Sequence, residues 1–165
     1  MTEPQSSFTD QVQKLIQQEL EGLKAQAEAL ADAYWTWRIA EDKKRPAGER
    51  SRLGLRVRET AKGSWSAEWY AFDWRATREG NKQRFRGLAK GTGDRYPDRV
   101  LLPQAQGWEW SEVRRTEDGL EELRRRAKLL GKLRFLTARF ERPDSGGAAG
   151  REPAAASARA SARAR

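Results

Sequence analysis

The spacing of the apolar residues changes twice along this chain, and that change limits the folds open to it. Across residues 8–37 apolar residues recur every three or four positions, whereas across residues 52–58 they alternate with Gly54 and three arginines. The three-to-four spacing returns across residues 120–140. A repeat near 3.6 places one apolar stripe on a helix, and a repeat of two places one apolar face on a strand. The chain is therefore predicted to be α+β, with a long helix on each side of a small sheet.

The first helix is predicted to run from Phe8 to Trp37. No glycine or proline interrupts it before Gly22, and glutamine, glutamate and lysine fill its other face. A helix of this kind buries its stripe either in the core of its own domain or in a dimeric coiled coil, and the sequence leaves both open. The stripe comprises Val12, Ile16, Leu20, Leu23, Ala27, Leu30, Tyr34 and Trp37.

Two of the predicted strands follow a charged loop at residues 42–50. The first presents Leu53, Leu55 and Val57 on one face and arginines on the other. The second, residues 65–74, carries aromatic residues at both odd and even positions. That pattern indicates either a central strand covered on both faces or a bulge near Trp69 and Tyr70 that changes which face points inward.

A third strand is predicted over residues 83–90, after a turn at residues 78–81. Its cations Lys82, Arg84 and Arg86 share one face by twofold spacing, while Phe85 points the other way. With a further turn at residues 61–63, the three strands form an antiparallel meander.

The closing helix is predicted to begin at Thr116, an N-cap residue, with Glu117 and Asp118 in the first turn, where the helix dipole favours acids. The preceding segment, residues 99–110, is interpreted as irregular, with one short strand as an alternative. One domain is predicted over residues 8–141, after a flexible N-terminus of residues 1–7. Residues 142–165 contain alanine, serine and arginine with no large apolar residue, so this basic tail is expected to be disordered.

Composition removes several kinds of chemistry. The chain has no cysteine and no histidine, which excludes disulfides, thiolate nucleophiles, zinc sites built on those residues and an imidazole base. Glu68 and Asp73 lie five apart on one predicted strand, hence on opposite faces, and are not expected to share a metal. We therefore expect a protein that is not an enzyme and uses no cofactor and no metal. No apolar run approaches the roughly 18 residues of a membrane span, so a cytoplasmic protein with no membrane partner is expected.

The charge points to a polyanionic partner. The chain carries 33 basic and 24 acidic residues, a net charge of +9, and the excess lies in the middle and the tail. Arginine and lysine interleaved with aromatic residues on a sheet can neutralise phosphates and stack on bases, and a basic helix can follow a phosphate backbone. The predicted nucleic-acid-binding residues of the sheet and the last helix are Arg52, Arg56, Arg58, Arg75, Arg78, Lys82, Arg84, Arg86, Arg124 and Lys128.

The order of these features resembles the MobI family of conjugative transfer proteins, which occur on bacterial mobile elements. The resemblance rests on the first helix ending in Tyr34-Trp35-Thr36-Trp37, the arginine-rich strand, the hairpin with Trp69-Tyr70 and Trp74, and the leucine- and arginine-rich helix from Thr116 to Phe140. It covers roughly residues 8–141. It implies an auxiliary factor at the origin of transfer that assists mobilisation without being the relaxase, and it supplies no catalytic residues.

The resulting hypothesis is a non-enzymatic DNA-binding accessory protein for the transfer of a plasmid or integrative element. Its expected partners are double-stranded DNA at the origin of transfer, the relaxase or other transfer proteins, and a second copy of the chain in a homodimer. The alternatives are a protein-interaction adaptor or dimeric helical module without direct nucleic-acid binding, and an RNA-binding protein.

Overall fold

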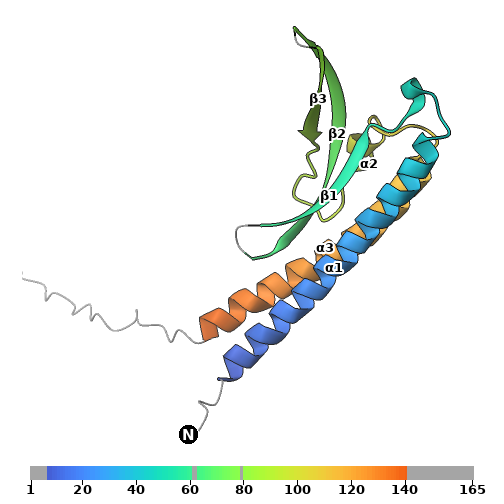
Figure 1. The fold of residues 1–165 in the computed structure, drawn as a ribbon. Coiled ribbons are helices and arrows are strands. Elements are labelled where there is room, and N and C mark those ends of the chain that lie inside the picture. The colour runs from blue at the N-terminus through green and yellow to red at the C-terminus, as the bar shows by residue number, and fades with distance from the viewer. Residues whose placement is uncertain (1–6, 61–62, 79, 141–165) are drawn as a thin grey trace, which may run out of the picture.

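The computed structural model describes residues 7–60, 63–78 and 80–140, without the side chains of residues 74–77 and 81. It has the predicted α+β architecture of a long helix, a three-stranded antiparallel sheet and a second long helix (Figure 1). The elements in chain order are α1 (Phe8–Asp42), the 3-10 turn η1 (Ala47–Glu49), β1 (Leu53–Glu59), β2 (Trp65–Thr77), β3 (Gly80–Gly87), α2 (Asp98–Leu101) and α3 (Trp110–Phe140). The predicted flexible N-terminus, apart from its last residue, and the predicted tail lie outside the described residues.

The first helix begins at a capping box. The Ser7 hydroxyl accepts a hydrogen bond from the Asp10 backbone N–H at 3.1 Å, and the Asp10 carboxylate accepts one from the Ser7 N–H at 3.2 Å. The predicted stripe is largely buried, from Ile16 through Leu23 to Tyr34. It packs against α3 and β1 of its own chain, so the core interpretation of this stripe is confirmed.

Trp69 of β2 lies at the centre of the core. Its ring meets the Tyr34 ring of α1 edge to face, with the centroids 5.0 Å apart. Leu55 of β1 and Leu120 of α3 belong to the same core cluster, and all four side chains are buried. Both long helices lie on the same side of the sheet (Figure 1), so one sheet face is covered and the other is not covered by a helix.

The register explains why aromatic residues occupy both faces of β2. Residues 65–71 pair with β1 and residues 70–77 with β3, one residue opposite one, without a bulge. Trp65 and Trp69 point into the core on the helix side, whereas Tyr70 and Phe72 point to the other side. β2 is the central strand, as the first interpretation has it, and it has no bulge. No long helix lies over the second aromatic face, where Tyr70 and Phe72 pack against each other and Phe72 also contacts Trp35 of α1.

The last helix begins earlier than predicted. It starts at Trp110, and Thr116 is buried inside it instead of forming its N-cap. We attribute the earlier start to tertiary packing, which can override local helix signals. Trp108, just before the helix, packs against Trp37 of α1 with the ring centroids 5.6 Å apart. The segment predicted as irregular, or as a short strand, contains the short helix α2 instead.

Strands β2 and β3 continue beyond the end of β1. The pairs from Phe72 with Phe85 to Thr77 with Gly80 have no β1 partner within that strand. This part of the hairpin, which we call the arm, extends away from the helices (Figure 1). Gly80 adopts a φ of 114° at the turn of the arm, a conformation that glycine tolerates and other residues rarely adopt.

Candidate nucleic-acid interface

The register divides the predicted sheet cations between two faces. Arg56 pairs with Glu68 and Arg84 pairs with Asp73. Since Glu68 and Asp73 are five residues apart on β2, they lie on opposite faces, as predicted, and so do their partners. Arg56 and Arg58 therefore do not cluster with Arg84 and Arg86 on one face of the sheet, although all four are among the predicted nucleic-acid-binding residues.

We call the sheet face turned away from the helices the open face. It carries Arg56, Arg58, Tyr70, Phe72 and Phe85, and Arg52 occupies the same parity just before β1. Arginines and aromatic residues therefore do lie together on this face of the sheet. Trp65 and Trp69, at the other parity of β2, belong to the core.

Glu68 neutralises part of the open face. Its Oε2 accepts a hydrogen bond from Arg56 Nη2 at 2.9 Å, and its Oε1 accepts one from Arg58 Nη2 at 2.8 Å. Burial alone would raise the pKa of Glu68, but the hydrogen bonds from Arg56, Arg58 and Ser66 outweigh it and lower the pKa. Two guanidiniums thus share one carboxylate, and the group keeps one net positive charge.

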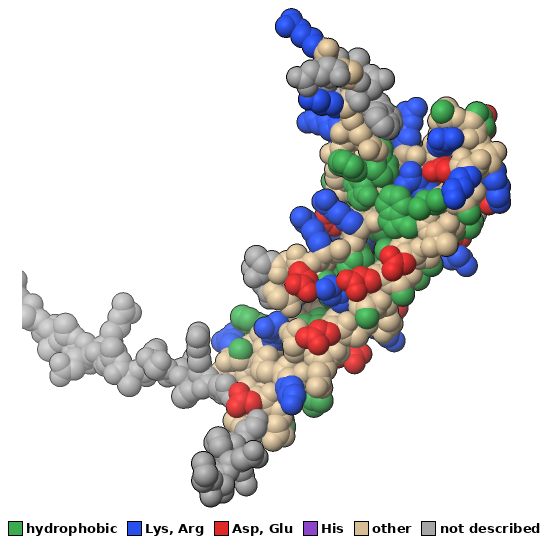
Figure 2. Space-filling model, viewed as in Figure 1, with side chains coloured by type: hydrophobic (Ala, Val, Ile, Leu, Met, Phe, Trp, Pro, Cys, Tyr) green, Lys and Arg blue, Asp and Glu red, His purple; other side chains and the backbone are tan. Residues whose placement is uncertain are grey.

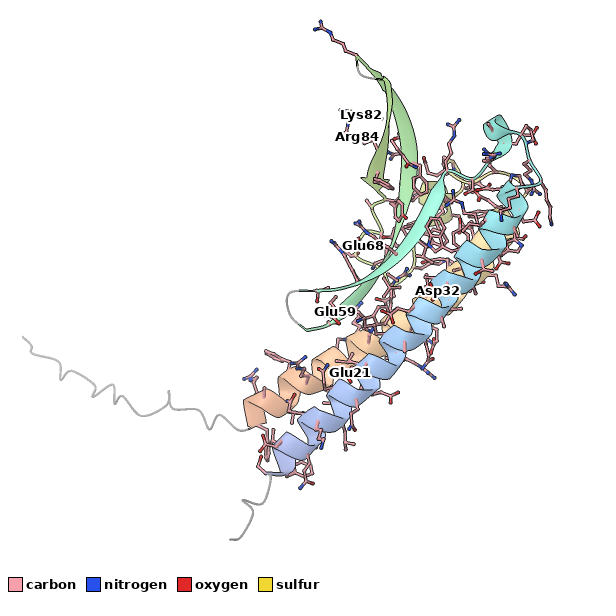
Figure 3. All side chains as sticks on the ribbon, in the orientation of Figure 1. Glu21, Asp32, Glu59, Glu68, Lys82 and Arg84 are labelled. Carbon is pink, nitrogen blue, oxygen red and sulfur yellow. The ribbon has the colours of Figure 1, made fainter. Side chains whose placement is uncertain are left out.

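The cations of β3 lie at positions of the same parity as the core residues, Lys82 and Arg84 on the arm and Arg86 just outside it, opposite Ala71. Figure 3 shows Lys82 and Arg84 on the arm, away from Glu68 and from the acidic residues of α1. Arg86 donates to Asp73 at 3.4 Å and to Gln104 at 3.0 Å. Arg84 is exposed and makes no hydrogen bond or ion pair with the described side chains.

Arg78 and Arg75 complete the predicted sheet set. Arg78 is exposed at the tip of the arm. Arg75 belongs to β2, and its side chain lies outside the described residues.

Arg124 is not a surface cation. Its side chain is 9% exposed, and its Nη1 lies 2.7 Å from Oε1 of Glu117, which is fully buried. Glu117 also accepts hydrogen bonds from Trp69 Nε1 and the Tyr96 N–H, each at 2.7 Å. The prediction that Arg124 reaches nucleic acid conflicts with this burial. The sequence placed Glu117 in the first turn of the helix and did not indicate this role, although a core tryptophan whose indole N–H needs an acceptor is a signal for a buried carboxylate.

The second half of α3 carries the densest positive charge. Residues 124–140 contain seven basic and no acidic residues. Arg125 and Arg126 pair with Glu122, and Lys128 lies 3.2 Å from Asp94. Three further exposed cations, Lys132, Arg134 and Arg139, form no ion pair with a described side chain.

The open face also carries an aromatic cluster. Phe72 lies 5.1 Å from Tyr70 and 5.3 Å from Phe85 between ring centroids, and Trp35 of α1 meets Phe72 edge to face. Phe85 remains 58% exposed. Figure 2 shows hydrophobic side chains gathered where the arm leaves the body of the molecule, with basic side chains beside them.

A pocket of about 360 Å³ adjoins this cluster and holds a residue that sequence analysis did not single out. Arg38 lies between the rings of Trp35 and Phe72, 4.7 and 5.1 Å from their centroids. It occupies the position of α1 where the buried stripe continues, four residues after Tyr34. The sequence did carry a signal for Arg38, namely a cation at a position of the apolar stripe. Such a residue needs a polar partner or a special role, because an isolated buried charge is costly.

Comparison with known protein families decides the family. A sequence model of the MobI protein family matches residues 23–137, from near the middle of α1 almost to the end of α3. The chain belongs to the MobI family. The match includes the whole sheet, the arm, Arg38 and the cations of α3 up to Arg134, whereas Arg139 lies just beyond it. Membership identifies a mobilisation-related protein. No curated protein and no solved structure matched the chain.

Two further kinds of feature are absent from the described part of this MobI chain. None of its described helices combines the length and apolar character that crossing a membrane requires. The described residues also contain no group of three or more carboxylate, histidine or cysteine side chains placed to hold a metal ion.

Proposed function

We propose that this MobI protein is a non-enzymatic, cytoplasmic accessory factor that binds DNA during the mobilisation of a plasmid or integrative element. The observation that carries the proposal is the second half of α3, where Lys132, Arg134 and Arg139 are exposed without a paired carboxylate among the described residues. Unpaired exposed cations on a helix can displace counterions from a phosphate backbone. The exposed cations of the arm, Arg78 and Arg84, add to the same field.

Duplex DNA at the origin of transfer is the partner this arrangement favours. A straight basic helix can follow a phosphate backbone or enter a major groove. The geometry supplies charge but no obvious set of base-reading amides, so affinity is expected to be dominated by phosphate contacts. The relaxase or another transfer protein would then supply the chemistry at the site.

The experiment is a titration of labelled duplex with the full-length protein over a series of salt concentrations. The double variant K132Q/R139Q should reduce the salt slope by about 1.8, since each phosphate contact on duplex DNA contributes about 0.9. A matched control, R99Q/R114Q, removes the same charge from two exposed arginines in α2 and the first turns of α3. A wild-type salt slope near zero, or an equal loss in the control, would contradict the proposal.

A second candidate function, protein interaction, is supported by apolar residues on the same helix. Leu129, Leu133, Leu136 and Phe140 are spaced four, three and four apart, and each is more than half exposed. That spacing suits a seam against another helix, from a transfer protein or a second copy of the chain. Light scattering of wild type and L133D would test it: a mass above the monomer that L133D lowers supports a homodimer, and a monomeric wild type removes that partner.

A further inference from the structure

We propose that the open face is a binding site for single-stranded DNA, in which the Arg38 pocket takes a backbone phosphate and the Tyr70–Phe72–Phe85 cluster takes a base. This inference rests on the proposed function, because it names a second form of the same ligand at a surface separate from α3. The site is built from the end of α1, the loop before β1, and the open faces of β2 and β3.

The pocket beside the cluster is chemically suited to an anion. Three arginines, Arg38, Arg50 and Arg52, line it, against the one carboxylate of Asp42. Asp42 is already engaged, since its Oδ1 accepts a hydrogen bond from the Ser51 N–H at 2.8 Å and its Oδ2 lies 3.4 Å from Arg38 Nε. The lining therefore keeps a net positive charge toward any molecule that enters.

Arg38 is held as a preorganised donor. Its side chain is only 10% exposed, and its Nη2 donates to the Ser51 carbonyl at 3.1 Å. Its Nη1 has no hydrogen-bond partner among the described residues. Buried guanidinium groups normally have acceptors for their N–H donors, and Arg38 lacks one for Nη1. A phosphate oxygen in the pocket would supply that acceptor.

The aromatic cluster begins at the wall of the pocket. Phe72 lines the pocket and packs directly against both Tyr70 and Phe85. Gln83, the next open-face residue of β3, also lines the pocket and provides an amide for a base edge. Arg56 stands over the Tyr70 ring at 5.7 Å, so cations border the cluster on both sides.

Single strands fit this surface better than duplexes. In a duplex each base face is already stacked on its neighbour, whereas a single strand can place its bases flat on exposed rings. Phe85 offers such a ring, and the backbone beside it would pass the Arg38 pocket. Protein ligands would require an acidic segment with an aromatic side chain, and nothing on the open face selects for one.

The test compares full-length wild type with F85A and R50Q, using a labelled oligothymidine and a labelled duplex at matched salt. F85A should weaken binding of the oligothymidine about tenfold, as the loss of one stacked base does, and leave the duplex affinity within about twofold. R50Q, in an exposed loop, should reduce the single-strand salt slope by about 0.7. F135A is the matched control, because Phe135 is 63% exposed on α3.

The outcomes separate this inference from the proposed function. Equal losses in F85A and F135A, or an unchanged single-strand affinity in folded F85A and R50Q, overturn the site on the open face. Steep salt dependence on duplex without binding of oligothymidine also overturns it, yet leaves the proposed function standing. Absence of binding to either nucleic acid removes both. An RNA oligomer of the same base that binds as tightly as the DNA, or more tightly, overturns the assignment to DNA.

Discussion

Glu117 and Arg124 form a buried ion pair that joins α3 to the sheet. The pair is 2.7 Å apart, and it also binds the Trp69 indole and the carbonyl of Ala67, the latter at 3.2 Å from Arg124 Nη2. The Arg124 guanidinium lies 5.2 Å from the Tyr96 ring centroid. The charge of Arg124 therefore holds the fold together and is not offered to a ligand.

Removal of one partner should destabilise the protein strongly. R124M leaves the Glu117 carboxylate buried and unpaired, and it should lower the free energy of unfolding by about 3–5 kcal/mol. Urea denaturation measures this. The double variant E117Q/R124M should recover part of the loss, because no uncompensated charge remains. R126M, a substitution of an exposed neighbour, is the control, and a loss in R124M no larger than in R126M would contradict the burial of this pair.

Periodicity predicted the elements of this fold well, and it predicted their relative register poorly. The stripe from Ile16 to Tyr34 and the alternation of Leu53 and Leu55 depend on local spacing, which the sequence displays directly. The start of α3 depended on the packing of Trp108 against Trp37, a contact between distant segments. No local pattern contains that information.

The need for contacts between distant segments also explains why the candidate site was predicted only in part. Twofold spacing correctly placed Lys82, Arg84 and Arg86 on one face of β3, but which face that is depends on the pairing of Thr77 with Gly80 across the turn. A shift of one residue would have moved every β3 side chain to the other face. Arg124 looked exposed because the neighbouring helix positions are basic, and its buried partner became visible only once Trp69 and Glu117 were brought together.

Gly54 should be sensitive to any side chain. A Cβ atom there would lie 2.3 Å from Cζ of Tyr70, so the ring could not keep its place across the strand. G54A should cost about 1–3 kcal/mol of unfolding free energy, as other overpacked substitutions do. Gly87, which pairs with Tyr70 from the other side, has open space at its Cβ position and provides the control G87A. Thermal unfolding of both variants decides it, and equal stability of the two would show that the Tyr70 ring has another position available.

Glu109 should make the protein less stable as the pH rises. Burial raises the pKa of its carboxyl above the ordinary 4.5, against smaller opposing effects of Ser51, Gln106 and Arg38. The native state then holds a proton that the unfolded state has lost, so stability falls as the pH rises from that ordinary value through the raised one. Its Oε2 has no hydrogen-bond partner among the described residues.

E109Q removes this dependence while keeping an acceptor for the Gln106 N–H, which lies 2.8 Å from Oε1. At pH 7 the variant should melt roughly 2–4 °C above wild type, and near pH 4 the two should melt together. E19Q, the same substitution at an exposed position of α1, should show no such difference. A melting temperature of E109Q below that of wild type at pH 7 would indicate that the charged form is the one the fold stabilises.

The contributions of the two arginine pairs of the sheet to the salt slope of duplex binding should not add. Arg56 and Arg58 lie on the open face, and Arg84 and Arg86 lie on the opposite face of the sheet. A straight duplex that rests on one face of a sheet cannot bring its phosphates to arginines on the other face. The salt slope of the quadruple glutamine variant should therefore fall by no more than about 1.8, the contribution of two phosphates, and the double variant of one pair should show the same fall.

The titration series uses one duplex, with circular dichroism to establish that each variant is folded. A fall of about 3.6 in the quadruple variant, with both pairs contributing equally, would mean that the arm twists enough to bring all four guanidiniums onto one DNA surface.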